Sequence, residues 1–401
     1  MSRIVVDAAL PAGREAAEAP PRAVRPRRLF IDNLRWSMIV LVISMHAADT
    51  YSPFGNWYYA DHGRVDPLTA LGFGTYQSFL QAFFMGLLFA VSGYFSRASL
   101  LRKGAAAFLR DRAIRLGVPT LLYMLAIGPV TQYFVAGSWR PSPPSSFARE
   151  WLGHIADGEV FSESGPLWFC LALLVFSALY AALAAVASPR RRHGSARDPG
   201  PGRIIAFILA MAGTTFALRL LCPSGRAVLN MQLGDFPQYV LMFAAGLHAQ
   251  RTGWPERLSA AAGAKWAAFG VLLGILGWAA IIGFGGALHG ELSAYAGGWT
   301  WQAAAKALWE AWVCVSFSLG LLTLYSALWD AQGRLARFLS ANAFAVYVVH
   351  PPILIAVTRL LHTWHAAPPV KFVAASMMGA AASFVFAAVI ARQTPLLRRV
   401  L

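Results

Sequence analysis

The stretch RLFIDNLRWSMIVLVISMHAADTY, residues 28–51, determines how the rest of the sequence is interpreted. Its middle is apolar enough to cross a lipid bilayer as one helix, which takes roughly 20 residues. Arg35 stands near its beginning, and His46 and Asp49 stand near its end. An ionisable side chain inside a membrane span is costly, so such a residue is a functional candidate by default. The stretch therefore predicts a first span that carries chemistry.

The composition of the whole chain is that of a membrane protein. Of its 401 residues, 57% are hydrophobic and only 13% are charged, about half the charged share of a soluble domain. Runs this long and apolar do not alternate as the strands of a membrane barrel do. We therefore predict an all-α polytopic membrane protein with about ten transmembrane helices. The expected spans, of which the sixth is the shortest, are 34–51, 75–96, 113–135, 166–187, 204–222, 236–250, 266–286, 308–329, 339–361 and 371–391.

The placement of positive charge predicts the orientation. If the N-terminus is cytoplasmic, 26 of the 34 Lys and Arg residues fall in segments expected inside, as the positive-inside rule requires. The other eight, with Arg219 and Lys306 among them, lie in outer loops or at outer helix ends. Both termini are then cytoplasmic. The net charge of +16 is explained by topology, and we predict no nucleic-acid partner, because no folded basic domain would carry one.

Three parts of the chain follow from this pattern. Residues 1–28, rich in Ala, Pro and Arg, are expected to be a disordered basic cytoplasmic tail. They lack the apolar segment of a signal peptide. Residues 29–391 form the transmembrane domain, and residues 392–401 form a short cytoplasmic tail.

Asp32, Arg35, His46 and Asp49 are expected on one face of the first helix. His46 lies eleven positions after Arg35, which is close to three turns and about 16 Å along the axis. Asp49 lies one turn beyond His46 and can fix the tautomer of its imidazole. The alternative is that Arg35 reaches back to the cytoplasmic interface while His46 caps a buried carbonyl.

His350 is the second candidate. It lies about as deep in the ninth span as His46 does in the first, and Tyr347 precedes it by one turn. Pro351 and Pro352 follow and free backbone carbonyls that need new partners. The alternative is that His350 only satisfies one of these carbonyls.

A basic group stands at the cytoplasmic end of the third span. Arg112 and Arg115 are i, i+3 neighbours there, and their guanidinium groups suit phosphate oxygens. The alternative is ordinary positive-inside charge. The three cysteines have no metal-binding spacing, so no metal site is predicted.

The outer loops, 52–74 and 136–165, combine aromatic side chains with carboxylates. Such surfaces suit carbohydrates. The alternative is an aromatic belt at the membrane interface.

Five segments together resemble the acyltransferase 3 family of integral membrane O-acyltransferases. Arg35 and His46 fit the Arg-x10-His signature of its first helix. The other four segments follow in order along residues 28–391: FAVSGYF (89–95), the pair Arg112 and Arg115, GPLWFCLALL (165–174) and LSANAFAVYVVHPPIL (339–354). The opening IDNLR and the WYY loop lean toward the branch that includes glucan biosynthesis protein C-like enzymes. Unlike members with a fused extracytoplasmic domain, this chain ends ten residues after its last span.

The resemblance implies transfer of an acyl group, of acetyl or succinyl type, from cytoplasmic acyl-CoA to a hydroxyl of an extracytoplasmic glycan. Acetyl-CoA or succinyl-CoA would be a co-substrate, with no permanently bound cofactor. The partners would be acyl-CoA, the glycan and membrane lipid, in the inner or plasma membrane of a bacterium. Arg35, Arg112 and Arg115 would bind the CoA phosphates.

Within this scheme His46 would act as general base or transient acyl carrier, oriented by Asp49. Tyr347 or His350 would stabilise the oxyanion. The competing function is a transporter or flippase of a glycan or lipid-linked substrate, against which the absence of an internal sequence repeat argues. A sensor or scaffold is the third, non-catalytic class.

Overall fold

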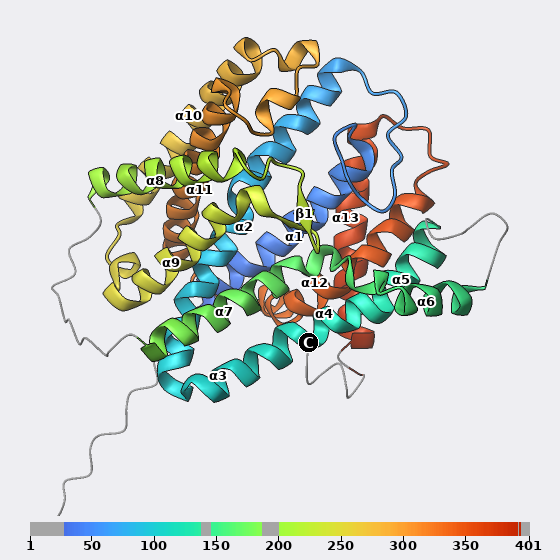
Figure 1. The fold of residues 1–401 in the computed structure, drawn as a ribbon, viewed down its shortest axis with the longest axis horizontal. Coiled ribbons are helices and arrows are strands. Elements are labelled where there is room, and N and C mark those ends of the chain that lie inside the picture. Colours follow the sequence, from blue (N-terminus) through green and yellow to red (C-terminus); the bar gives the residue numbers. More distant parts are fainter. Residues whose placement is uncertain (1–27, 138–145, 187–199, 392, 394–401) are drawn as a thin grey trace, which may run out of the picture.

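The computed structural model describes residues 28–137, 146–186, 200–391 and 393. The tails predicted at 1–28 and 392–401 lie outside these residues, except for Arg28 and residue 393. The described chain is mostly helical, and its strands form one short hairpin (Figure 1). Its helices are α1 Leu29–Tyr51, α2 Pro67–Lys103, α3 Ala105–Arg112, α4 Val118–Leu122, α5 Gly128–Val130, α6 Phe147–Ala156, α7 Trp168–Val186, α8 Pro201–Arg219, α9 Phe236–Thr252, α10 Ala260–Phe284, α11 Trp301–Leu328, α12 Arg334–Leu360 and α13 Pro368–Phe386. The strands are β1 Ala227–Val228 and β2 Met231–Gln232.

The all-α membrane fold is confirmed. In the described part of the chain, nine helical segments are long and apolar enough to cross a membrane. Nine of the ten predicted spans correspond to these segments. The short run at 236–250 is helical too, as α9, and its 17 residues lie at the lower limit of the roughly 17 to 25 that a span takes.

Helix α9 packs lengthwise against α2, in the most extensive contact between two of the described helices. Two glycines make the approach possible. A Cβ atom on Gly93 would lie 2.1 Å from the carbonyl oxygen of Phe243, and one on Gly246 would lie 2.0 Å from that of Ala90. Small residues let backbones in membranes pack this closely. The FAVSGYF segment therefore has a packing role, as its small residues indicate.

The third span, residues 105–136, is not a uniform α-helix. It widens into π turns at Ala113–Gly117, Tyr123–Ile127 and Thr131–Ala136. Pro119 and Pro129 are the second residues of the short α segments between them. Since proline has no N–H to donate to the preceding turn, the local hydrogen-bond pattern shifts.

Helix α1 lies in the interior of the bundle, in contact with α2, α11, α12 and α13 (Figure 1). It is unbroken over 23 residues, so Arg35 and His46 do lie on one continuous helix. Its beginning is held by the 329–333 turn: Phe30 N donates to Asp330 Oδ1 at 3.0 Å, and Asn33 Nδ2 donates to the Trp329 carbonyl at 2.7 Å.

Candidate active site

His46 begins a chain of hydrogen bonds that leads into α2. Its Nδ1 lies 3.1 Å from Asp49 Oδ2, as the one-turn spacing predicts. Gln77 Nε2 donates to the other oxygen of Asp49 at 2.7 Å, and Ser52 Oγ donates to Gln77 Oε1 at 2.7 Å. Ser52 and Gln77 are both buried. Because an ionised carboxylate only accepts hydrogen bonds, His46 Nδ1 is the donor in this pair, and the neutral imidazole then has its lone pair on Nε2.

Three nearly parallel rings lie together here, those of His46, Trp57 and His350. The indole of Trp57 stacks on the imidazole of His46 at 3.9 Å between centroids, with 13° between planes. The imidazole of His350 lies 5.5 Å from that of His46 and 6.4 Å from Trp57, again nearly parallel to both. The structure thus brings the two predicted histidines together, and adds Trp57 from the outer loop.

Two buried nitrogens in this group have no hydrogen-bond partner among the described residues. They are Trp57 Nε1, a donor, and His350 Nε2. A buried polar atom without a partner costs roughly 1–3 kcal/mol. Such atoms beside a histidine pair indicate a place that a ligand completes.

His350 also has the structural role considered as its alternative. Pro351 cannot donate to the carbonyl of Tyr347, four residues earlier, and His350 Nδ1 lies 2.8 Å from that oxygen. The imidazole thus replaces the missing backbone bond. Its Nδ1 is therefore occupied, while Nε2 stays open.

Tyr347 is placed differently from its predicted role. Its hydroxyl donates to the carbonyl of Pro166 in a short hydrogen bond, so this proton is not available to an oxyanion in the same arrangement. Tyr347 instead ties α12 to the GPLW segment. Two segments that are 181 residues apart in sequence are joined by this bond.

The turn before α7 fits tightly against its surroundings. Gly165 has a φ of +53°, and a Cβ there would lie 2.4 Å from the ring of Tyr123. Its N–H donates to Asn230 Oδ1 at 2.9 Å, from the turn between β1 and β2. Glycine is needed at this position for both its conformation and its contact, which explains the first residue of GPLW.

The loop that carries Trp57 is fixed at its far side. Asp61 Oδ2 accepts from Lys371 Nζ at 3.2 Å, and Asp61 Oδ1 lies 3.0 Å from His362 Nδ1. Next to Trp57, burial raises the pKa of Tyr58 to about 12. Tyr58 therefore stays neutral at physiological pH and accepts a hydrogen bond from Tyr123.

A cavity of about 1040 Å³ lies beside these rings, at the upper end of the range for ligand pockets. His46, Asp49 and Trp57 line one part of it. Most of the remaining lining comes from α2, from the GPLW turn, from the 219–235 segment and from α10, α11 and the loop between them, and Tyr347 of α12 also contributes. All the contributing loops are those predicted to share the outer side.

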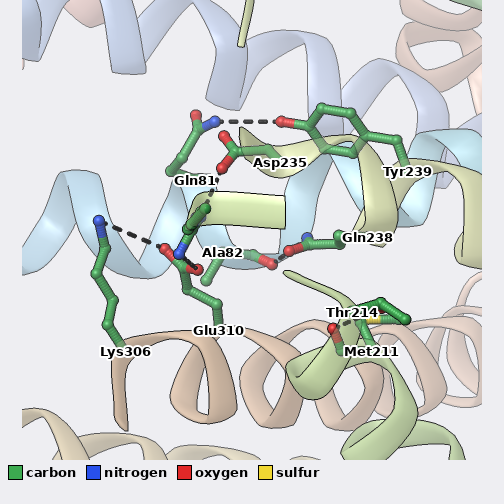
Figure 2. Close-up of polar contacts among 10 residues, drawn as sticks. Gln81, Ala82, Met211, Thr214, Asp235, Gln238, Tyr239, Lys306 and Glu310 are labelled. Carbon is green, nitrogen blue, oxygen red and sulfur yellow. Dashed lines mark hydrogen bonds and ion pairs between the residues drawn. The ribbon is translucent and has the colours of Figure 1, made fainter. Parts of the chain in front are cut away.

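Another part of the cavity lining carries charged side chains that sequence reasoning did not bring together. Arg219, only 2% exposed, donates to Glu310 Oε2 and to Asp235 Oδ1, each at 2.6 Å. Lys306 Nζ lies 3.7 Å from the other oxygen of Glu310. Figure 2 shows Lys306 and Glu310 one turn apart on the same helix, with Asp235 above them.

The predicted phosphate-binding arginines gather at the opposite end of α1. Arg112 Nη2 donates to Ser96 Oγ at 3.0 Å, one residue beyond the FAVSGYF segment. Arg35 and Arg115 are close enough for their charges to act on Arg112. The π turn that follows Arg112 leaves Arg115 exposed while Arg112 is half-buried, so the pair does not share one face as an α-helix would predict.

Fold and site together define a multi-pass membrane protein with a histidine-centred cavity at one end and a basic cluster at the other. The sequence model of the acyltransferase 3 family, described as an acyltransferase domain, matches residues 28–391. The chain therefore belongs to this family and is a membrane acyltransferase. Comparison with curated proteins found no match, and neither did comparison with solved structures.

Proposed function

We propose that this enzyme transfers an acyl group, of acetyl or succinyl type, from acyl-CoA on the cytoplasmic side to a hydroxyl of an extracytoplasmic glycan. The observation that carries the proposal is the hydrogen-bonded His46, held by Asp49 at the wall of a large cavity. We place the enzyme in the inner or plasma membrane of a bacterium. The proposal extends the family's general activity to a particular donor and acceptor.

The donor would bind along α1. Arg35, Arg112 and Arg115 offer guanidinium groups to the phosphates of CoA. The axial distance from Arg35 to His46 is about 16 Å, which suits the pantetheine arm that separates those phosphates from the thioester. The sulfur would then arrive beside His46 from one side, and the acceptor from the cavity.

His46 Nε2 removes the proton from the acceptor hydroxyl as its oxygen attacks the thioester carbonyl. The tetrahedral intermediate collapses by breaking the carbon–sulfur bond, and Nε2 returns the proton to the departing thiolate. The products are an ester and free CoA. Asp49 stabilises the imidazolium that exists between these two steps.

The oxyanion needs a hydrogen-bond donor at the same place. The hydroxyl of Tyr347 is hydrogen-bonded to the Pro166 carbonyl, and His350 Nδ1 is hydrogen-bonded to the backbone carbonyl of Tyr347. Neither group is therefore open to the oxyanion. Trp57 Nε1 is buried without a partner among the described residues. We therefore assign the oxyanion contact to Trp57.

The test replaces His46 by Ala in purified protein and measures both CoA release and ester formation from labelled acetyl-CoA and succinyl-CoA. A general base contributes a factor of roughly 10² to 10⁴, so transfer should fall at least about 100-fold. His248→Ala, at an exposed position of α9, is the matched control. Wild-type transfer by His46→Ala would overturn the assignment, and transport of a glycan without thioester consumption would favour a flippase.

A further inference from the structure

The cluster formed by Arg219, Asp235, Glu310 and Lys306 is not required by the chemistry assigned to His46. Its members come from the end of α8, the residue before α9, and α11. All four line the same cavity as His46. A buried ion pair is often no more stabilising than an apolar pair of similar size. Stability alone therefore does not explain why these four charged residues line the cavity.

Several polar atoms of the cluster have open hydrogen-bonding capacity. Among the described residues, Arg219 Nε is buried without a partner. Asp235 makes no side-chain cap to α9, and only its Oδ1 is bonded to Arg219. Glu310 Oε1 lies 3.7 Å from Lys306 Nζ, beyond hydrogen-bonding distance. The cluster thus presents open donors next to open acceptors.

This alternation suits hydroxyl groups. A hydroxyl donates one hydrogen bond and accepts others, so neighbouring hydroxyls on a ring satisfy carboxylate oxygens and cationic nitrogens together. Phosphate and carboxylate ligands only accept. They would use Arg219 and Lys306 but leave the open oxygens of Asp235 and Glu310 facing negative charge.

The charge of the whole cavity supports the same ligand class. Among the described lining residues, four are carboxylates, Asp49, Glu163, Asp235 and Glu310, whereas two are cations, Arg219 and Lys306. The formal balance is negative, so a polyanion such as CoA is disfavoured here. An acidic sugar is disfavoured for the same reason.

We infer that this cluster is the acceptor-binding site, and that it selects uncharged sugars by their hydroxyl groups. The inference rests on the proposed function, because it names the acceptor of that reaction. Glu310 and Asp235 accept hydrogen bonds from the sugar, while Lys306 and Arg219 donate to it. A second hydroxyl of the same glycan then reaches His46 across the cavity.

The test measures binding without any acyl donor, so that its result does not depend on acyl transfer. The full-length protein in lipid nanodiscs is titrated calorimetrically with cellotetraose, maltotetraose and mannotetraose, and with tetragalacturonic acid as the acidic counterpart. At least one neutral oligomer should bind, and the acidic one should bind at least about tenfold more weakly. Glu310→Gln and Lys306→Met should each weaken neutral binding by about tenfold or more.

Two exposed residues outside the cavity lining provide matched controls, Glu291→Gln for the carboxylate and Lys265→Met for the lysine. Both should bind as the wild type does. If Glu310→Gln shows no melting transition, that variant is not folded, and the binding measured for Lys306→Met, at a half-buried position, decides the result. Equal or tighter binding of the acidic oligomer, unchanged binding by Lys306→Met, or no binding of any neutral oligomer would each overturn the inference. A failed acyl-transfer assay with intact neutral binding would reject the proposed function alone.

Discussion

At the scale of single residues, the two histidines differ in what holds their Nδ1 atoms. Asp49 holds His46 and a backbone carbonyl holds His350. A carboxylate stabilises an imidazolium more than a neutral carbonyl does, so His46 is the better placed of the two to carry the proton during transfer. Each of these partners lies three residues from its histidine in the sequence, so the spacing along one helix was enough to predict the contact. Gln77 and Trp57 approach His46 through tertiary contacts and could not be predicted in this way.

Trp57→Phe tests the oxyanion assignment, because phenylalanine keeps an aromatic ring on His46 and removes only the indole N–H. Loss of one oxyanion donor costs about 10² to 10³ in kcat, so kcat should fall in that range with KM for acyl-CoA nearly constant. Steady-state kinetics with acetyl-CoA provide the measurement. Trp364→Phe, at an exposed site, is the control, and a kcat within about twofold of the wild type for Trp57→Phe would contradict the role.

At the scale of helices, apolar length was sufficient to predict where the spans lie. It was not sufficient for their local geometry. The π turns of the third span depend on Pro119, Pro129 and the neighbours that accommodate them. Whether a run such as 236–250 crosses the membrane depends on its packing against α2, and that packing depends on which glycines face each other.

Gly246→Ala tests the α2–α9 contact. The new Cβ would lie 2.0 Å from the Ala90 carbonyl oxygen, so the two helices must separate. We expect a melting temperature in detergent several degrees lower than that of the wild type. A Cβ added at Gly213 of α8 would meet no atom within 4 Å, and Gly213→Ala should hold or raise stability, since alanine favours helix by about 0.5–1 kcal/mol. If Gly246→Ala and Gly213→Ala had the same melting temperature, the close approach of α2 and α9 at Gly246 would be contradicted.

At the scale of the whole molecule, the cavity is assembled from segments that are distant in sequence. Arg219 and Glu310 are 91 residues apart. The charge count assigned Arg219 and Lys306 to outer helix ends, and this gave no reason to join them to Glu310. The sequence signal that could have indicated the site is Glu310, an acidic residue within the expected span 308–329, and it was not used. The cluster of Arg219, Lys306 and Glu310 can be recognised only when the positions of α8 and α11 relative to each other are known.

The orientation in the membrane is testable on the whole chain. In a Cys222→Ser background, Arg64→Cys and Arg102→Cys occupy exposed positions at the two ends of the molecule, and the other native cysteines are buried. If the N-terminus is cytoplasmic, a membrane-impermeant maleimide applied to intact cells should label the first variant and not the second. Inside-out vesicles should reverse this pattern. The opposite labelling would place the cavity on the cytoplasmic side.

The unbroken course of α1 has a consequence for how this chain can vary in length. One residue inserted between Arg35 and His46 would turn the imidazole by about 100° about the helix axis, away from Trp57 and His350. Inserting seven residues would nearly restore the angle but move the ring by about 10 Å along the axis. No side-chain rotation recovers either change. The interval between these two residues therefore admits substitutions but no insertion or deletion, whereas the connection from Ser52 to Asp66 can change length wherever it leaves Trp57 and Asp61 in place.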